Sequence, residues 1–227
     1  MQTKLMQGDC MELLKCIPDG SIDMVLCDLP YGTSSNRWDL VIPFAPLWRQ
    51  YDRIVKRHGA IVLFGCEPFS TKLRMSNLNA YKYDWIWDKH GVNGFLNANK
   101  RPLKRYENIC VFSFGAPVYF PQKEIRGRPR NKGGYNKKIG HGDGVYGKYE
   151  NVKTVNNEYY PTDILSFSNA DHTNKVHTTQ KPVPLLEYLI RTYTSTGMTV
   201  LDNCMGSGST GVACANTERN FIGIELD

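Results

Sequence analysis

The sequence lacks the long apolar stretches and the leader pattern of membrane-spanning and exported chains. None of its apolar runs approaches the roughly 18 residues that a membrane-spanning helix requires. The start, Met1-Gln2-Thr3-Lys4, shows no signal-peptide pattern. We therefore expect no membrane partner and a cytoplasmic location.

Paired cysteines are also missing. The seven cysteines, at positions 10, 16, 27, 66, 110, 204 and 214, include no C-x-x-C pair. An odd, dispersed set of this kind predicts buried thiols in a reducing compartment rather than a disulfide framework or a zinc cluster. Histidines and paired carboxylates at metal-ligand spacing are absent from the sequence as well, so we expect no metal ion.

Negative charge is scarce in one segment of the chain. The 227 residues carry a net charge of +6. Between Pro121 and Tyr160, nine basic residues face four acidic ones, which accounts for +5 of that excess. The same segment holds seven glycines and five tyrosines and has no helical or strand periodicity. It is typical of a basic insertion between two better-patterned halves, and its size favours nucleic-acid phosphates over a solvated surface loop.

The two flanking halves alternate apolar strands with amphipathic helices. Strands are predicted at residues 4–7, 24–27, 61–64, 83–87, 109–114, 199–201 and 221–224. Helices are predicted from Asp9, over 44–55 with Gly59 as the closing residue, from Pro182 to Gly197, and over 209–216. Strand, helix and strand at this spacing predict an α/β fold with parallel strands and right-handed crossovers.

A glycine-rich turn near the end of the sequence predicts a nucleotide-type cofactor site. Residues 200–211 read VLDNCMGSGSTG, and the next strand leads to Glu225. Glycines at 206 and 208 let the backbone approach a ligand closely, and a carboxylate at the tip of the second strand can accept hydrogen bonds from ribose hydroxyls. Because Asp202 would repel a pyrophosphate but attract an ammonium group, the pattern favours S-adenosylmethionine over NAD.

A second polar motif follows a buried strand. Residues 28–31 read DLPY and come directly after the apolar run MVLC. Ligands of open α/β sheets bind at the carboxyl ends of strands, which makes Asp28, Pro30 and Tyr31 candidates for a site. Taken alone, the tetrapeptide is equally typical of a strand-ending turn with a core tyrosine.

The two motifs in this order, with HTTQKP at 177–182 between them, resemble the β-class of DNA amino-methyltransferases. These enzymes methylate exocyclic nitrogens. In that family a D/N/S-P-P-Y/F motif comes first, a target-recognition region follows, and the glycine-rich cofactor motif comes last. This chain differs in having leucine at the second motif position and Met205, after a cysteine, where phenylalanine is common. The resemblance extends over nearly the whole chain, including GDC at 8–10 and RYENI at 105–109.

The resemblance implies a Rossmann-like, seven-stranded methyltransferase sheet that is circularly permuted. Residues 1–114 and 177–227 would form the catalytic domain, and residues 115–176 an inserted target-recognition region. S-adenosylmethionine is the implied cofactor and double-stranded DNA the implied partner, while a homodimer and a cognate restriction endonuclease stay open. The family also implies a prokaryotic or phage-encoded protein.

Residue roles follow from the same resemblance. Asp28 and a backbone carbonyl at Leu29–Pro30 would accept the hydrogens of the target amino group, and Tyr31 would stack on a flipped base. The implied cofactor residues are Asp9, Lys181, Asp202, Gly206, Gly208 and Glu225. Asp9 has an equally simple explanation as a helix cap, and Lys181 as a residue that packs ahead of its helix. Direct transfer needs no cysteine nucleophile.

Two basic clusters are the predicted DNA contacts. They are Lys100, Arg101, Lys104 and Arg105 between two strands, and Arg126, Arg128 and Arg130 in the insertion. The expected product is N6-methyladenine, because that is the more frequent product in the family. N4-methylcytosine is the alternative, ahead of a catalytically silent DNA-binding module and of a methyltransferase for RNA or protein.

Overall fold

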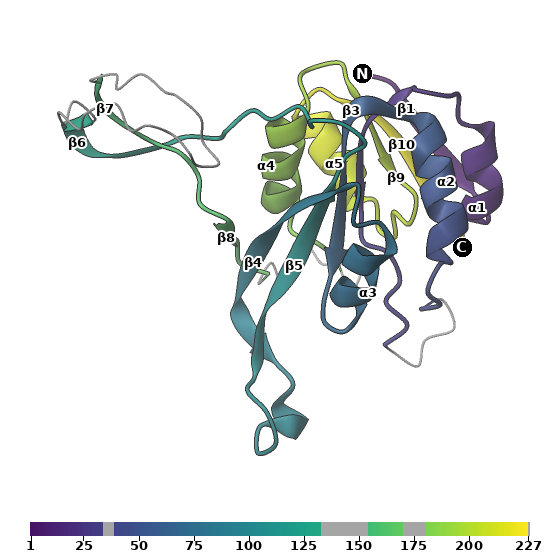
Figure 1. Cartoon of the computed structure of the whole chain (residues 1–227), viewed down its shortest axis with the longest axis horizontal. Helices are drawn as coiled ribbons and strands as arrows, with labels where there is room; N and C mark the ends of the chain where they lie inside the picture. Colours follow the sequence, from purple (N-terminus) through teal and green to yellow (C-terminus); the bar gives the residue numbers. More distant parts are fainter. Residues whose placement is uncertain (34–38, 133–153, 170–179, 227) are drawn as a thin grey trace. The chain divides into compact units, whose positions relative to one another are not determined.

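A computed structural model describes residues 1–33, 39–132, 154–169 and 180–226 (Figure 1). The chain divides into two compact units. One is formed by Met1–Phe120 with Thr162–Asp227, and the other by Pro121–Pro161. The smaller unit falls inside the predicted insertion, whose boundaries at 115 and 176 stay a prediction.

A mixed, mostly parallel sheet of eight strands forms the centre of the larger unit, in the order β1-β10-β9-β2-β3-β5-β4-β8. The strands are β1 Thr3–Gln7, β2 Ile22–Cys27, β3 Val55–Gly65, β4 Tyr81–Asn93, β5 Lys104–Phe112, β8 Ile164–Ser166, β9 Thr199–Asp202 and β10 Asn220–Glu225. Only β5 runs antiparallel to its neighbours in this sheet as described. The seven predicted strands and the α/β class are confirmed, and β8 adds a short eighth strand.

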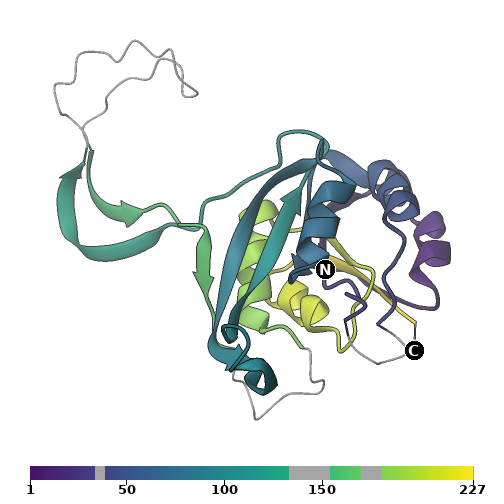
Figure 2. The ribbon, with the colours of Figure 1, turned by 60° about the horizontal axis from the view of Figure 1, so that its bottom comes forward.

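Helices cover both faces of the sheet (Figures 1 and 2). They are α1 Cys10–Leu13, α2 Phe44–Ile54, α3 Phe69–Ser76, α4 Val183–Tyr193 and α5 Ser209–Asn216. Val25 and Ile61 pack with the α1–α3 side, whereas their neighbours Met24 and Val62 pack with α4 and α5. Because successive side chains of a strand point to opposite faces, one sheet serves two apolar cores.

The end of α2 differs from the prediction. The helix stops at Ile54, where the β-branched Val55 takes an extended conformation and begins β3. Gly59 therefore lies within the strand and does not close the helix. A Cβ at Gly59 would come within 2.8 Å of the Asp23 carbonyl oxygen, so close packing of β3 against β2 explains this glycine.

One predicted helix is shorter than expected, and several other elements had no clear pattern in the sequence. The helix from Asp9 is a single turn followed by a 3₁₀ turn, Leu14–Cys16. Helix α3 was not predicted because its apolar positions are few. In the smaller unit, β6 Glu124–Lys132 pairs antiparallel with β7 Thr154–Tyr159. These are exposed strands, which lack the apolar alternation of a core-facing strand.

Helices long and apolar enough to cross a membrane are not found among the described residues.

Candidate active site

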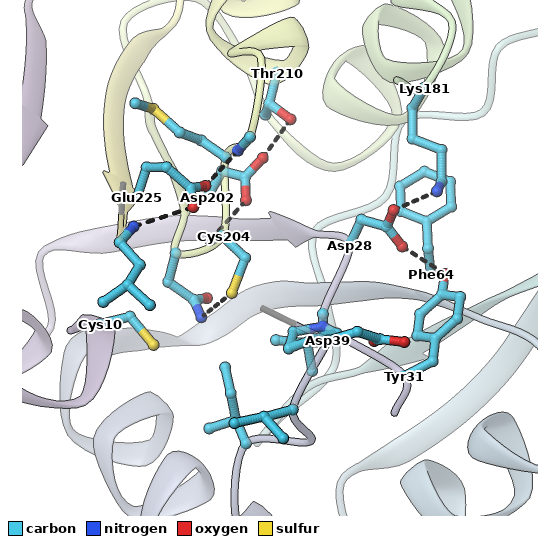
Figure 3. Close-up of a pocket in the computed structure, with 18 of the residues that line it drawn as sticks. Cys10, Asp28, Tyr31, Asp39, Phe64, Lys181, Asp202, Cys204, Thr210 and Glu225 are labelled. Atoms are coloured by element: carbon cyan, nitrogen blue, oxygen red, sulfur yellow. Dashed lines mark hydrogen bonds and ion pairs between the residues drawn. The ribbon is translucent and has the colours of Figure 1, made fainter. Parts of the chain in front are cut away.

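A cavity of about 850 Å³ lies at the carboxyl ends of the parallel strands. Its volume is within the range of small-molecule sites, roughly 300–1,000 Å³. The predicted catalytic and cofactor residues line it, with the exception of Gly208. We call the part formed by Asp9, residues 202–207, Ser209, Thr210 and Glu225 the glycine-turn end, and the part formed by Asp28, Tyr31, Phe64 and Lys181 the Asp28 end (Figure 3).

Backbone conformation explains the glycines of the turn. Gly206 and Gly208 have φ angles of 49° and 78°, in the left-handed region that favours glycine. No atom lies within 4 Å of a Cβ built at either position, so the space beside the turn is open. Gly223 on β10 has a different function, because a Cβ there would collide with the Met205 sulfur. The absence of that side chain lets the turn pack against β10.

Two carboxylates hold the turn through its backbone. Glu225 Oε2 accepts a hydrogen bond from the Gly206 amide at 2.6 Å. Asp202 accepts from the Cys204 amide at 3.2 Å and from the Thr210 hydroxyl at 2.6 Å. Burial raises the pKa of Asp202 to about 6, even though both hydrogen bonds favour its charged form. A cationic ligand group at this carboxylate would offset that cost.

Asp9 lies at the glycine-turn end of the cavity and does cap its helix. Its Oδ1 accepts from the Met11 amide at 2.8 Å, and the residue also lines the cavity. The capping explanation is therefore correct, and it leaves the second carboxylate oxygen available to a ligand.

Three thiols gather at the glycine-turn end, where Cys10 and Cys204 line the cavity and Cys27 is buried. A hydrogen bond with Cys204 and burial raise the pKa of Cys10, and burial raises the pKa of Cys27 to about 12. The pKa of Cys204 is also raised well above its ordinary value, by contact with Cys27 and by burial, which outweigh its hydrogen bond with Cys10. Thiols in this condition stay protonated near neutral pH and are poor nucleophiles.

Asp28 is held between two donors at its end of the cavity. One carboxylate oxygen accepts from the Tyr31 hydroxyl and the other from the Lys181 ammonium. The Tyr31 ring packs on Phe69 with centroids 4.8 Å apart. Burial and the charge of Asp28 raise the pKa of Tyr31, so its hydroxyl remains a donor. The two bonds fix the position of the Asp28 carboxylate.

Lys181 links Asp28 to a second half-buried carboxylate, that of Glu107. Its Nζ lies 3.6 Å from Glu107 Oε2, and Glu107 also receives a hydrogen bond from Lys89 at 2.9 Å. Burial alone lowers the pKa of Lys181, but Asp28 and Glu107 more than offset this and raise it. Burial likewise opposes the charge of Glu107, and the two lysines lower its pKa overall. The four groups form a chain of alternating charge, Lys89–Glu107–Lys181–Asp28.

A comparison with known protein families shows to which family the chain belongs. The family model described as DNA methylase, for N6 and N4 methyltransferases, matches residues 22–227. The chain belongs to this DNA methylase family. The order of its parts, with the Asp28 motif before the glycine turn, agrees with the resemblance found in the sequence.

Curated relatives of this DNA methylase are bacterial Type II methyltransferases. M.HpaI of Haemophilus parainfluenzae is 27% identical over all of this chain and 71% of its own length. M.HinfI of Haemophilus influenzae is 27% identical over 98% of this chain, which spans only 64% of that relative. M1.MboII of Moraxella bovis is 27% identical over 99% of this chain and 92% of its own length.

Solved structures share the fold. The cytosine-N4-specific PvuII DNA methyltransferase superposes with a TM-score of 0.71 at 17% identity, over all of this chain and 83% of that one. M1.HpyAVI in complex with S-adenosylmethionine gives a TM-score of 0.64 at 23% identity, over all of this chain and 94% of that one.

The site of this methylase includes residues that the sequence analysis did not assign. Glu107 and Lys89 join the Asp28 end through Lys181, and the Phe64 ring lies 5.2 Å from the Lys181 ammonium. Phe64 is the last apolar residue of a buried strand, and this position at the carboxyl end of a strand could have indicated a site residue from the sequence. Glu107 stands in the quoted RYENI segment, but its pairing depends on residues that are 18 and 74 positions away in the sequence. Of HTTQKP, residues 177–179 lie outside the described residues.

The predicted DNA-binding residues differ in their partners. Arg105 makes two hydrogen bonds of 2.8 Å to Asp88, which lower the pKa of that carboxyl to about 2. Arg126 pairs with Glu124 and lies 5.6 Å from the Tyr159 ring. Lys100, Arg101, Lys104, Arg128 and Arg130 have no carboxylate partner within the described ranges. The unpaired cations are the better candidates for phosphate contacts.

Proposed function

We propose that this methylase transfers a methyl group from S-adenosylmethionine to the exocyclic N6 of adenine in double-stranded DNA, by direct transfer to a flipped base. The observation that carries the proposal is the shared cavity, in which the Asp28 carboxylate faces the same space as a glycine turn with open space beside it. Membership of the DNA methylase family and the bacterial Type II relatives support it.

The glycine-turn end fits the cofactor. Open space beside Gly206 and Gly208 admits a ligand backbone, and Glu225 presents its carboxylate at the tip of β10 for the ribose hydroxyls. Asp202 is suited to the ammonium of the methionine part, because a nearby cation would relieve the burial that raises its pKa. Asp9 retains an oxygen for the adenine amino group. When bound, S-adenosylmethionine supplies an electrophilic methyl group on a sulfonium sulfur.

The Asp28 end fits the target amino group. The lone pair of that nitrogen is delocalised into the base, so the nitrogen must become more pyramidal before it reacts. Asp28 and a backbone carbonyl at Leu29–Pro30 would each accept one N–H and favour that geometry. Tyr31 lines the cavity beside Asp28 and offers a ring to the flipped base. Lys181 binds Asp28 and is itself held by Glu107, so the two residues fix the position of the Asp28 carboxylate.

The same geometry serves N4 of cytosine, which is also an exocyclic amino group next to a ring nitrogen. N4-methylcytosine therefore remains the second candidate product, and the cytosine-N4-specific PvuII enzyme shares the fold. A catalytically silent module is disfavoured by the organised Asp28 end, and an RNA or protein substrate by the family. A homodimer, a cognate endonuclease and a cytoplasmic location remain expectations for this chain.

Incubation of the protein with plasmid DNA and isotopically labelled S-adenosylmethionine tests the proposal, followed by mass spectrometry of the nucleosides. Labelled N6-methyladenine is the expected result. Labelled N4-methylcytosine would show that the target base is cytosine and not adenine, and the proposed mechanism of direct transfer would still apply. The function would be refuted if wild-type protein bound the cofactor but produced no labelled nucleoside.

Phosphate binding by the smaller unit has a separate test. Neutralising Arg126, Arg128 and Arg130 together should weaken binding to every DNA sequence, and each lost contact should lower the slope of log affinity against log salt by roughly 0.9. A loss confined to one sequence would mean that an arginine reads a base edge. Unchanged affinity and slope would identify the segment as a solvated surface.

A further inference from the structure

The strand pair β4–β5 extends past the edge of the sheet at which the cavity lies. Strand β3 ends at Gly65, which pairs with Asn108 of β5, and Asn108 pairs with Ile86 of β4. Residues 87–93 and 104–107 therefore continue beyond the carboxyl end of β3, and the pair projects from the sheet as a hairpin (Figures 1 and 2). Because β4 is parallel to β2 and β3, its tip lies on the same side as Asp28.

The tip of this hairpin exposes two adjacent apolar side chains. A 3₁₀ turn, η2 Phe95–Asn97, follows Gly94, whose φ is 95°. Leu96 is 99% exposed and Phe95 is 67% exposed. Neither belongs to the two apolar cores, and among the described residues Leu96 is the most exposed large apolar side chain. Intramolecular packing does not account for leucine and phenylalanine at this position.

Cations that have no carboxylate partner among the described residues stand directly beside the apolar tip. Lys100 and Arg101 are exposed in the turn, and Lys104 begins β5. Farther down the stem, Arg105 is neutralised by Asp88, so the free positive charge is concentrated at the tip. Apolar side chains next to free cations complement a partner with a charged exterior and an apolar stacked interior. Duplex DNA has that chemistry.

The hairpin stem is joined to the proposed catalytic carboxylate. Glu107 on β5 pairs with Trp87 on β4 and contacts Lys181, which binds Asp28. Between the pairs Trp87–Glu107 and Asn93–Lys104, β5 advances by three residues, which is about 10 Å of extended strand, and β4 bulges over the same interval. DNA that delivers a base to Asp28 must therefore lie alongside the stem, with the tip within reach of the neighbouring base pairs.

We propose that Phe95 and Leu96 insert into the base stack beside the flipped nucleotide, while Lys100 and Arg101 bind the flanking phosphates. The inference rests on the proposed function, since it presupposes a flipped target. Extrusion of a base leaves a gap in the stack, and apolar wedges in other proteins occupy such opened steps. The hairpin would thus lower the cost of opening the duplex without touching the reacting atoms.

The test is the double variant Phe95→Ala/Leu96→Ala, compared with Met75→Ala/Leu78→Ala. The control pair is also exposed, and it lies at the end of α3 and ahead of β4, away from the tip. Single-turnover methylation is measured on two oligonucleotide duplexes that carry the site found methylated in plasmid DNA. One is fully paired, and the other has an abasic position opposite the target, which removes the pairing that the wedge helps to break.

We expect the tip variant to be about 10- to 100-fold slower on the paired duplex and within threefold of wild type on the abasic duplex. The control variant should match wild type on both, and all three proteins should bind S-adenosylhomocysteine equally. Equal loss on both duplexes, or no loss, would overturn the wedge. A shift from dimer to monomer by light scattering would identify the tip as a contact between copies instead. Wild-type activity on the paired duplex separates failure of the wedge from failure of the proposed function.

Discussion

The two ends of the cavity are built in different ways. At the glycine-turn end, carboxylates hold backbone amides, as Glu225 holds Gly206 and Asp202 holds Cys204. At the Asp28 end, side chains of opposite charge hold each other, and they come from the segment after β2, from β4 and β5, and from the segment before α4. The first arrangement shapes a surface for a ligand, whereas the second fixes the position of one carboxylate. Substitutions at the two ends should therefore separate cofactor affinity from the rate of transfer.

Loss of the Asp28 carboxylate should have the largest effect. We expect Asp28→Ala to slow single-turnover methyl transfer by about 10²- to 10⁴-fold, because it removes an acceptor for the reacting amine. Calorimetry should find the affinity for S-adenosylhomocysteine unchanged, since the glycine turn is intact. Asp52→Ala, on the exposed side of α2, is the matched control. A parallel loss of cofactor affinity would show that the two ends are not independent.

Glu107→Gln tests whether the Asp28 end depends on its chain of charges. Misplacement of Lys181 and Asp28 should slow transfer by about 10- to 100-fold while cofactor affinity is kept. Lys181 would lose one of the two carboxylates that raise its pKa, so the alkaline limb of the pH–rate profile should move to lower pH.

Stability supplies a second measurement for Glu107. Its pKa is lowered by folding, so its contribution to stability is present above its ordinary pKa near 4.5 and is lost as the pH falls through the depressed value. The Glu107→Gln variant should lack the part of the free energy of unfolding that wild type loses at acidic pH. Glu12→Gln, which breaks an exposed pair with Lys15, is the control and should change neither measurement. A variant with the wild-type rate and pH profile would reduce Glu107 to a packing residue.

At the glycine-turn end, Asp202 predicts a pH-dependent cofactor affinity. Its pKa of about 6 means that acidification from pH 7 to 5 protonates the carboxylate, so the affinity should fall by up to about tenfold per pH unit below 6. The stability of the cofactor-free protein has the opposite pH dependence, because folding raises the pKa of Asp202. The contribution of this carboxyl to the free energy of unfolding is fully present below pH 3.8 and is lost as the pH rises through 6. Calorimetry across this range with wild type and Asp202→Asn measures the effect, and a flat profile in wild type would contradict it.

Glu225→Gln should have the smallest effect. A weakened hydrogen bond to ribose corresponds to about a 3- to 10-fold higher dissociation constant for S-adenosylhomocysteine. DNA affinity should not change, and neither should the rate at saturating cofactor. If cofactor affinity equals that of wild type, Glu225 serves only to hold the Gly206 amide.

The difference between the two ends also explains what the sequence could predict. The glycine turn and Glu225 lie within one strand–helix–strand unit, so their spacing along the chain determines their positions. The seven core strands were predictable for a similar reason, because burial on both faces leaves an apolar run such as MVLC at 24–27.

Features that depend on pairing between distant segments could not be predicted. Glu107 acquires its role only when β5 turns back beside β4 and Lys181 arrives from the segment before α4. The full length of β4 was also missed, since residues 88–93 extend past the core and lose the apolar pattern. The end of α2 was misplaced because Gly59 resembled a helix cap, while its actual cause is the Asp23 carbonyl on a neighbouring strand.

The pairing of β1 with β10 ties cofactor binding to the order of folding. Gln2 and Asn220 are hydrogen-bonded across 218 positions of sequence, and Gly8 donates to the Glu225 carbonyl at 2.8 Å. Contacts this far apart are the most expensive in chain entropy and tend to form late. Asp9 and Glu225 come together only at that step, so ligand binding should report completion of the sheet, and ligand should in turn protect the strand pair that is otherwise first to separate.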